Sequence, residues 1–196
     1  MLGIDHEYIP EDALQGDVPG SRPDVRTVYC EVMQMGACKL DANGLERAVL
    51  NLTVRAHRLH TIPVWLTRMT GMTEERRSRG VSFPEALQRL VAFVGEATNV
   101  WTFNGDWWVL EGNAKAHGIE LPFATPFKRL KPLLPGLGIH LADFQRAGFG
   151  EVCSGGLHRV LGIELPHTEG VGAHDATHDA RSLAYAVHQL GLGDVP

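Results

Sequence analysis

Cysteine is scarce in this chain, which has 3 in 196 residues. Cys30, Cys38 and Cys153 are odd in number and lack the paired spacing that zinc ligands show. The pattern argues against both a disulfide framework and a cysteine-based metal site. We expect reduced thiols, which are typical of a cytoplasmic protein, with Cys30 and Cys38 packed in a strand.

Long hydrophobic runs are also missing. No apolar stretch approaches the roughly 20 residues that cross a bilayer, and no basic start followed by an apolar segment indicates a secretory signal. We therefore expect a cytoplasmic protein without a membrane partner. The hydrophobic content of 44% is ordinary for a globular protein, and 196 residues predict one domain, residues 1–196, with a substantial core.

Positive charge is in deficit, because 18 Lys and Arg face 23 Asp and Glu, for a net charge of −5. This balance excludes a protein that coats nucleic acid electrostatically. It does not exclude an enzyme that grips one strand end in a local cleft. Carboxylates clustered around metal ions would contribute to the negative sum.

The order of expected elements predicts an α/β fold. A strand at residues 2–8 precedes a loop from 9 to 24, and strands at 27–40 and 46–56 flank an Asn43-Gly44 turn, which predicts an antiparallel hairpin. Residues 63–73 are expected to be a connecting segment. Strand–helix units then follow, so we expect one mixed sheet with an antiparallel hairpin plus parallel strands, flanked by helices. The later elements are expected at 83–94 (helix), 99–103 (strand), 106–117 (helix), 154–161 (short helix capped by Ser154) and 176–190 (helix).

Two carboxylates share one face of the first strand. Asp5 and Glu7 are two residues apart, so both side chains point the same way. Two neighbouring carboxylates repel each other, and a shared cation relieves the repulsion. A polar edge strand that faces solvent is the alternative.

Two further carboxylates stand at positions that favour a site. Asp179 lies beside the apolar stripe of the last helix, where a carboxylate is costly unless it is paired or holds a metal. Asp106 directly follows the strand at 99–103 and opens a helix, and ligand sites in α/β sheets favour such positions. Taken alone, Asp106 is better explained as a helix cap; taken with the other carboxylates, it is better explained as part of a site.

The motifs Asp5-x-Glu7, Asn104-Gly105-Asp106 and His174-x-x-x-x-Asp179 occur in the order typical of one family. Together they resemble the DnaQ-like DEDDh 3′–5′ exonucleases, and the resemblance covers residues 2 to 191. Within that family the chain is most similar to the KapD-like and ERI-type exoribonuclease branch. Connecting pieces also match: residues 34–41 resemble the second strand, 66–73 an "LTGIT"-like segment, and Ser154-Gly155-Gly156-Leu157 the run before the last motif.

The resemblance implies an RNase H-like fold and a two-metal hydrolysis. Asp5, Glu7, Asp106 and Asp179 would hold two Mg²⁺ or Mn²⁺ ions, hard cations that prefer oxygen ligands. His174 would take the proton of the attacking water as general base. The product would be a nucleoside 5′-monophosphate, released one at a time from the 3′ end of RNA or DNA. The resemblance also allows a homodimer, although no sequence feature identifies an interface.

Substrate contacts are less well defined, because the chain departs from the family near the first motif. Tyr8-Ile9-Pro10 stands where the family usually has a Thr, and the loop at 9–24 is longer than the family's. RNA versus DNA stays open, since contacts to the 2′ position cannot be placed. The candidates for substrate contact are Glu7, His6, Tyr8, Asn104 and Trp107.

Other residues have competing interpretations. His174 and His178 are four apart, as for two zinc ligands or an HD-type phosphohydrolase, but no further His-containing motif supports that site. Asp175 and His178 are expected to be exposed residues at a helix start. Of Trp107 and Trp108, at most one would line a cleft and stack on bases. Two basic groups, Lys128-Arg129-x-Lys131 and Arg76-Arg77-x-Arg79, either contact phosphates or are solvated surface.

Two classes of function therefore stand side by side. The first is a metal-dependent 3′–5′ exonuclease. The second is a catalytically weak nucleic-acid-binding or polymerase-associated module of the same fold. The complete set of four carboxylates and His174 favours the enzyme, because a module kept only for binding has no need of a general base.

Overall fold

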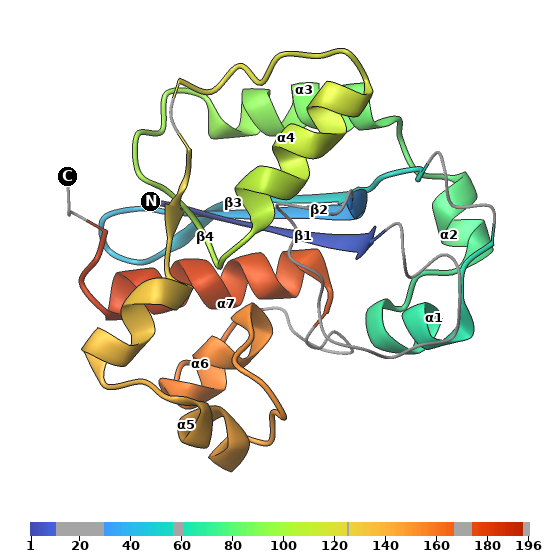
Figure 1. The fold of residues 1–196 in the computed structure, drawn as a ribbon. Coiled ribbons are helices and arrows are strands. Elements are labelled where there is room, and N and C mark those ends of the chain that lie inside the picture. The colour runs from blue at the N-terminus through green and yellow to red at the C-terminus, as the bar shows by residue number, and fades with distance from the viewer. Residues whose placement is uncertain (11–29, 57–60, 125, 167–173, 194–196) are drawn as a thin grey trace.

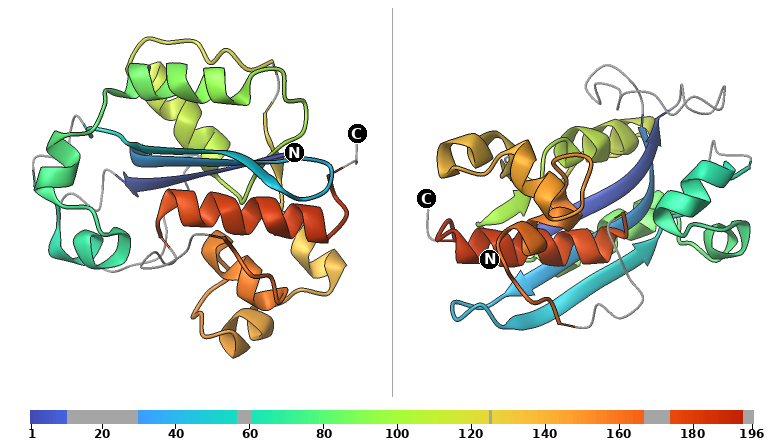
Figure 2. Two further views of the ribbon diagram at one scale, coloured as in Figure 1. Left: turned by 180° about the vertical axis from the view of Figure 1, so that it is seen from behind. Right: turned by 90° about the horizontal axis from the view of Figure 1, so that it is seen from below.

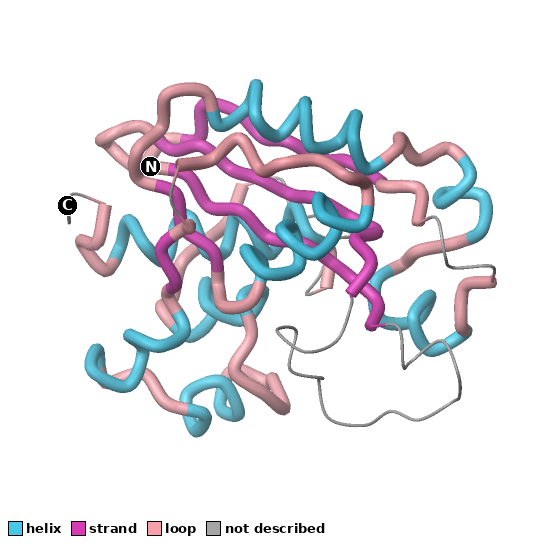
Figure 3. Tube along the Cα trace, turned by 45° about the horizontal axis from the view of Figure 1, so that its top comes forward, coloured by secondary structure: helices cyan, strands magenta, loops and turns pink. Residues whose placement is uncertain are grey.

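The computed structural model describes residues 1–10, 30–56, 61–124, 126–166 and 174–193. Its centre is a five-stranded sheet with the order β3-β2-β1-β4-β5 (Figure 3). β1 pairs antiparallel with β2, which pairs antiparallel with β3, whereas β1–β4 and β4–β5 are parallel. The predicted mixed sheet is confirmed. The strands are β1 (Leu2–Pro10), β2 (Cys30–Leu40), β3 (Glu46–Thr53), β4 (Val100–Thr102) and β5 (Lys128–Arg129).

Helices cover both faces of this sheet (Figure 1). α3 and α4 lie on one face and α7 lies on the other, with α5 and α6 outside α7 and with α1 and α2 beyond the end of the sheet. Figure 2 shows the same layers from behind and from below. The helices are α1 (Val64–Thr70), α2 (Glu74–Ser78), α3 (Phe83–Val94), α4 (Asp106–Ala116), α5 (Leu141–Arg146), α6 (Leu157–Val160) and α7 (Ala176–Gln189), with 3-10 turns η2 (Lys131–Leu137) and η3 (Ser154–Gly156).

Alternation along the strands separates two cores. Leu2 and Ile4 of β1 pack toward α3 and α4 in the larger cluster of buried residues. A second cluster joins Trp101 and Phe103 to α7, α5 and α6. Cys30 and Cys38 are buried thiols of β2, as the sequence predicts.

Two glycines let α7 lie directly on the strands. A Cβ atom added at Gly36 of β2 would stand 2.0 Å from the Ala176 carbonyl oxygen, and one at Gly3 of β1 would stand 2.7 Å from that of Ala180. The facing residues of α7 are also small, since Ala184 follows Ala180 by four positions and lies against Gly3. The helix backbone therefore approaches the sheet more closely than side chains on both partners would allow.

Several expected boundaries differ from the structure. The segment 63–73, expected to be a connection, contains α1, which ends at Gly71 with a φ of 67°. The short helices α2 and α5 were not expected either, because five or six residues carry too little periodicity to detect. Ile9 and Pro10 extend β1 instead of starting the loop. Residues 27–29 and most of the long loop, 11–24, lie outside the described residues.

Among the helices of the described residues, none has both the length and the apolar character needed to cross a membrane.

Candidate active site

The four predicted carboxylates converge from three elements. Asp5 and Glu7 come from β1, Asp106 from the first turn of α4 and Asp179 from the first turn of α7. Each is buried, with at most 8% of its surface exposed. Burial raises the pKa of Asp5 well above its ordinary value, and the charges of Asp106, Asp179 and Glu7 raise it further. The carboxylates thus interact as one cluster.

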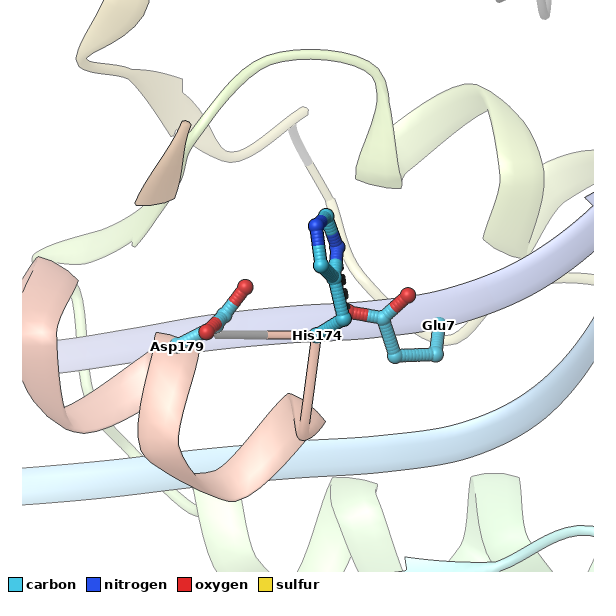
Figure 4. Close-up of side chains that lie close together, drawn as sticks. All are labelled: Glu7, His174 and Asp179. Carbon is cyan, nitrogen blue, oxygen red and sulfur yellow. Dashed lines mark ion pairs between the residues drawn. The ribbon is translucent and has the colours of Figure 1, made fainter. Parts of the chain in front are cut away.

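His174 reaches the same point from the residue pair that precedes α7. Ligand atoms of Glu7, His174 and Asp179 lie within 4.8 Å of one another, and Figure 4 shows the three side chains converging. The Nδ1 atom of His174 is 3.9 Å from Oε1 of Glu7. The His174 side chain is 24% exposed, whereas the carboxylates lie deeper. The imidazole therefore stands at the entrance to the cluster.

The backbone of His174 is strained. Its φ is 70°, and within the described part of the chain no other non-glycine residue has a positive φ. This left-handed conformation costs an ordinary side chain about 1 kcal/mol or more, and such residues gather at functional sites.

Asp106 is anchored to β1 and does not cap its own helix. Gly105 is the N-cap of α4, with no side-chain cap bond. The Asp106 Oδ1 atom accepts a hydrogen bond from the backbone N–H of His6 at 3.1 Å, and Oδ2 accepts one from that of Asn104 at 3.4 Å. The His6 ring, itself buried, places Nδ1 3.5 Å from Asp106 Oδ1. These contacts hold Asp106 beside Asp5 and Glu7.

Ser154 joins the cluster from the opposite side. Its hydroxyl donates to Oδ2 of Asp179 at 3.0 Å, and it lowers the pKa of Asp5 against the larger raising effects. Ser182 in turn donates to the Ser154 carbonyl at 2.7 Å. Sequence reasoning gave Ser154 the role of a helix N-cap, but Cys153 takes that position. Only the fold brings this hydroxyl to the two carboxylates, which are 149 and 25 residues away in the chain.

Gln34 fixes the start of α7. It is buried in β2, and its side-chain Oε1 accepts from the Ala176 backbone N–H at 3.2 Å while Nε2 donates to the Thr70 carbonyl at 3.3 Å. It thereby satisfies one unpaired N–H at the start of α7 and one unpaired C=O at the end of α1. Nothing in the sequence distinguished this glutamine from other polar residues of a strand.

Asp175 completes the start of α7. Its side chain accepts from the backbone N–H groups of Thr177 at 3.0 Å and His178 at 3.2 Å, and pairs with Arg76 of α2 at 3.6 Å. Since His174 directly precedes Asp175, these contacts also restrict where the imidazole lies.

Gln34→Leu is expected to lower the free energy of unfolding by about 1–3 kcal/mol, because two buried backbone groups lose their partners. Urea unfolding measures this effect against Gln88→Leu, the same substitution at an exposed position of α3. Equal stability of the two variants would contradict this role of Gln34.

His178 differs from its expected position. The sequence suggested an exposed helix-start residue, but His178 is 5% exposed and contacts the His158 ring edge-on at 5.1 Å. Burial lowers the pKa of His178 and lowers that of His158 to about 4. In the part of the chain that the structure describes, the candidate metal ligands that gather around His174 are Glu7 and Asp179, without His178. The His174/His178 zinc pair therefore gains no support.

The candidates for substrate contact occupy different environments. Asn104 is exposed, Tyr8 is half-buried and His6 is buried against Asp106. Trp107 packs edge-on against Phe127, with ring centroids 5.1 Å apart, and belongs to an aromatic group on the larger core.

The cluster fits divalent cations. The charges that raise the pKa of Asp5 are all carboxylates, and within the described residues no cation is among the groups that shift it. Buried carboxylates of one sign need a compensating charge. Their oxygens are the ligands that Mg²⁺ and Mn²⁺ prefer.

Comparison with known proteins matches the fold, although no family and no curated protein matches the sequence. A full-length 3′-exonuclease superposes with a TM-score of 0.69 at 15% identity, over 97% of this chain and 60% of that one. The nuclease domain of 3′hExo, a DEDDh family member bound to rAMP, gives 0.66 at 15% identity over 98% and 92%. A 3′-exonuclease that recognises the 3′ end of a histone mRNA stem-loop gives 0.71 at 14% identity over 98% and 81%.

These similarities assign the fold. The sheet with its flanking helices is the RNase H-like arrangement of 3′-exonucleases, as the sequence motifs predicted. The chain spans 60% of the full-length 3′-exonuclease and nearly all of the 3′hExo nuclease domain.

Proposed function

We propose that this chain is a metal-dependent 3′–5′ exonuclease of the DEDDh type, with residues 1–196 forming one nuclease domain. Its substrate is the 3′ end of single-stranded RNA or DNA, and its product is a nucleoside 5′-monophosphate. The observation that carries the proposal is the convergence of Glu7, His174 and Asp179, with ligand atoms within 4.8 Å of one another, on a buried carboxylate cluster.

Each residue has a role that suits its position. Asp5, Glu7, Asp106 and Asp179 would hold two Mg²⁺ or Mn²⁺ ions. When bound, the ions supply an activated water and stabilise negative charge on the phosphate and the leaving oxygen. His174, at the entrance to the cluster, accepts the proton of the water as general base, for which an imidazole is suited near neutral pH.

Ser154 and Gln34 support these groups without touching the substrate. The Ser154 hydroxyl holds Asp179 in place and favours the ionised form of Asp5. Gln34 holds the N-terminus of α7, which follows His174. A rigid arrangement matters because misplacement of a catalytic group by about 1 Å can cost 10²-fold in rate.

The experiment is digestion of 5′-labelled and 3′-labelled single-stranded RNA and DNA with Mg²⁺, with Mn²⁺ and with chelator. Stepwise shortening from the 3′ end is expected, with loss in chelator and in Asp5→Ala. His174→Asn is expected to lower the rate about 10²–10⁴-fold while strand binding persists. Asn is suited to this test because it tolerates a positive φ better than most residues.

The matched control is His140→Asn. His140 is exposed at the N-cap of α5, a position that Asn also fills well, so this variant should digest at the wild-type rate. Full activity of His174→Asn would reject the general base. Strand binding with no shortening by the wild-type protein would favour the weakly catalytic binding module.

A further inference from the structure

The two basic groups of the sequence differ in how their charge is compensated. In α2 and at its C-cap each arginine pairs with a carboxylate: Arg76 with Asp175, Arg77 with Glu74 and Arg79 with Glu75. These pairs leave little net positive field at α2.

The basic group at 128–131 has aromatic partners. Lys128 lies 5.7 Å from the centroid of the Trp101 ring and Lys131 lies 5.6 Å from that of Phe103. Arg129 lies 4.8 Å from the centroid of Trp108. Among the residues that the structure describes, no carboxylate forms an ion pair with Arg129 or Lys131. Their charge is therefore available to an anion.

This group lies at the edge of the sheet that carries the carboxylates. Arg129 of β5 is in register with Thr102 of β4, and the Lys131 N–H donates to the Phe103 carbonyl at 2.9 Å. β4 then leads directly to Asp106. Since β1, β4 and β5 are parallel, their carboxyl ends meet at one edge.

Trp108 links the basic group at 128–131 to the carboxylate cluster. It stands in the first turn of α4, two residues after Asp106, and it is half-buried with Arg129 over its ring. Its neighbour Trp107 points instead into the aromatic group around Phe127. Of the two tryptophans, Trp108 is thus the one beside an available cation.

We propose that Arg129, held on the face of Trp108, binds the phosphodiester backbone of the substrate strand upstream of the scissile bond, with Lys131 as a second contact. A planar guanidinium stacked on an indole presents its N–H donors in a fixed orientation, which suits phosphate oxygens. A cluster of buried carboxylates repels a polyanion, so a cation at its edge favours approach of the strand. This assignment rests on the proposed function, because it names where that substrate lies.

The test measures binding of short single-stranded RNA and DNA in a His174→Asn background, in which turnover is expected to be about 10²–10⁴-fold slower. Arg129→Ala is expected to raise the Kd about 10-fold on both polymers, the cost of losing a hydrogen bond to a charged group. The slope of log K against the logarithm of the salt concentration should decrease in magnitude by about 1. Arg129→Lys should retain part of the affinity, since lysine keeps the positive charge but lacks the planar set of N–H donors of a guanidinium.

Arg89→Ala is the matched control, because Arg89 is exposed on α3 and pairs with Glu85. It should bind with the affinity of the parent. Thermal unfolding of all variants verifies that each is folded.

A second substrate separates binding from catalysis. A nucleoside 5′-(p-nitrophenyl phosphate) has no upstream phosphate, so Arg129→Ala with His174 intact should hydrolyse it at the wild-type rate. A lower rate on this ester, or an unchanged Kd for both strands, would overturn the assignment.

The inference and the proposed function can fail separately. Unchanged binding by Arg129→Ala, while the wild-type protein still shortens strands, rejects the Arg129 site alone. Weakened binding by Arg129→Ala, without strand shortening by the wild-type protein, supports the site and rejects the exonuclease.

Discussion

Gly36→Ala is expected to destabilise the protein by about 3 kcal/mol or more and to lower hydrolysis at least 10²-fold. The new methyl group would stand 2.0 Å from the Ala176 carbonyl oxygen and 2.2 Å from its carbon, both of them backbone atoms. No rotamer change relieves such a clash, so α7 must move away from β2. Because α7 carries Asp179 and follows His174, the movement separates both from Asp5 and Glu7.

Gly112→Ala is the control for this substitution. Gly112 lies inside α4, and an added Cβ there meets nothing within 4 Å. Alanine should stabilise that helix by up to about 1 kcal/mol. Urea unfolding and strand digestion of both variants measure the contrast. A Gly36→Ala variant with the stability and rate of Gly112→Ala would show that α7 does not depend on the close approach.

Asp5→Asn is expected to abolish hydrolysis and, in chelator, to make the protein more stable than the wild type. The reason is that a buried carboxylate among three others is costly without a cation. Each unit by which the pKa of Asp5 is raised corresponds to about 1.4 kcal/mol that ionisation removes from stability. Removing the charge removes this cost.

The pH dependence follows from the same shift. A carboxyl whose pKa is raised in the folded state binds more protons there than in the unfolded chain. The metal-free wild type should therefore lose stability as the pH rises from the ordinary Asp value of 3.8 to the raised pKa of Asp5. Asp5→Asn should lose less over this range.

Asp41→Asn is a control whose expected effect on stability is opposite to that of Asp5→Asn. Asp41 is half-buried in the turn between β2 and β3, where the backbone N–H of Leu45 and the Arg47 side chain lower its pKa. Ionised Asp41 therefore stabilises the folded protein at pH values above its ordinary pKa. This stabilisation is lost as the pH falls through the lowered pKa. Removing Asp41 should destabilise the protein near neutral pH, where removing Asp5 stabilises it.

Metal addition provides the second readout for Asp5. At a free Mg²⁺ concentration 100 times the Kd, the wild type should gain about 2.7 kcal/mol. Thermal unfolding with and without Mg²⁺ should show this gain in the wild type and in Asp41→Asn, but not in Asp5→Asn. A wild type that gains nothing from Mg²⁺ or Mn²⁺ would contradict the metal site.

Much of the fold could be predicted from the sequence, because its signals are local. Alternating residues, the Asn43-Gly44 turn and apolar residues three and four positions apart predict strands at 2–8, 27–40 and 46–56 and helices at 83–94, 106–117 and 176–190. The structure has β1, β2, β3, α3, α4 and α7 in these places, with ends that differ by up to three residues. α1, α2 and α5 were missed since they are seven, five and six residues long, which is too short for a periodic pattern.

The residue types at the site could be predicted as well. The three motifs that contain the four carboxylates and His174 are recognised from residue identity and chain order alone. The sequence by itself determined that Asp5 and Glu7 share a face, because side chains alternate along a strand. It also determined that Asp179 lies at the edge of an apolar helical stripe.

Only the tertiary structure decided which of the remaining residues serve the site. Ser154 reaches Asp179, Gln34 reaches Ala176, and Arg129 lies on Trp108, all across 21 or more positions of sequence. Likewise His178 became a buried residue and the α2 arginines became ion pairs. Such contacts depend on how α7 and the sheet pack, and that packing is set by the space that Gly3 and Gly36 leave open, which no local pattern reveals.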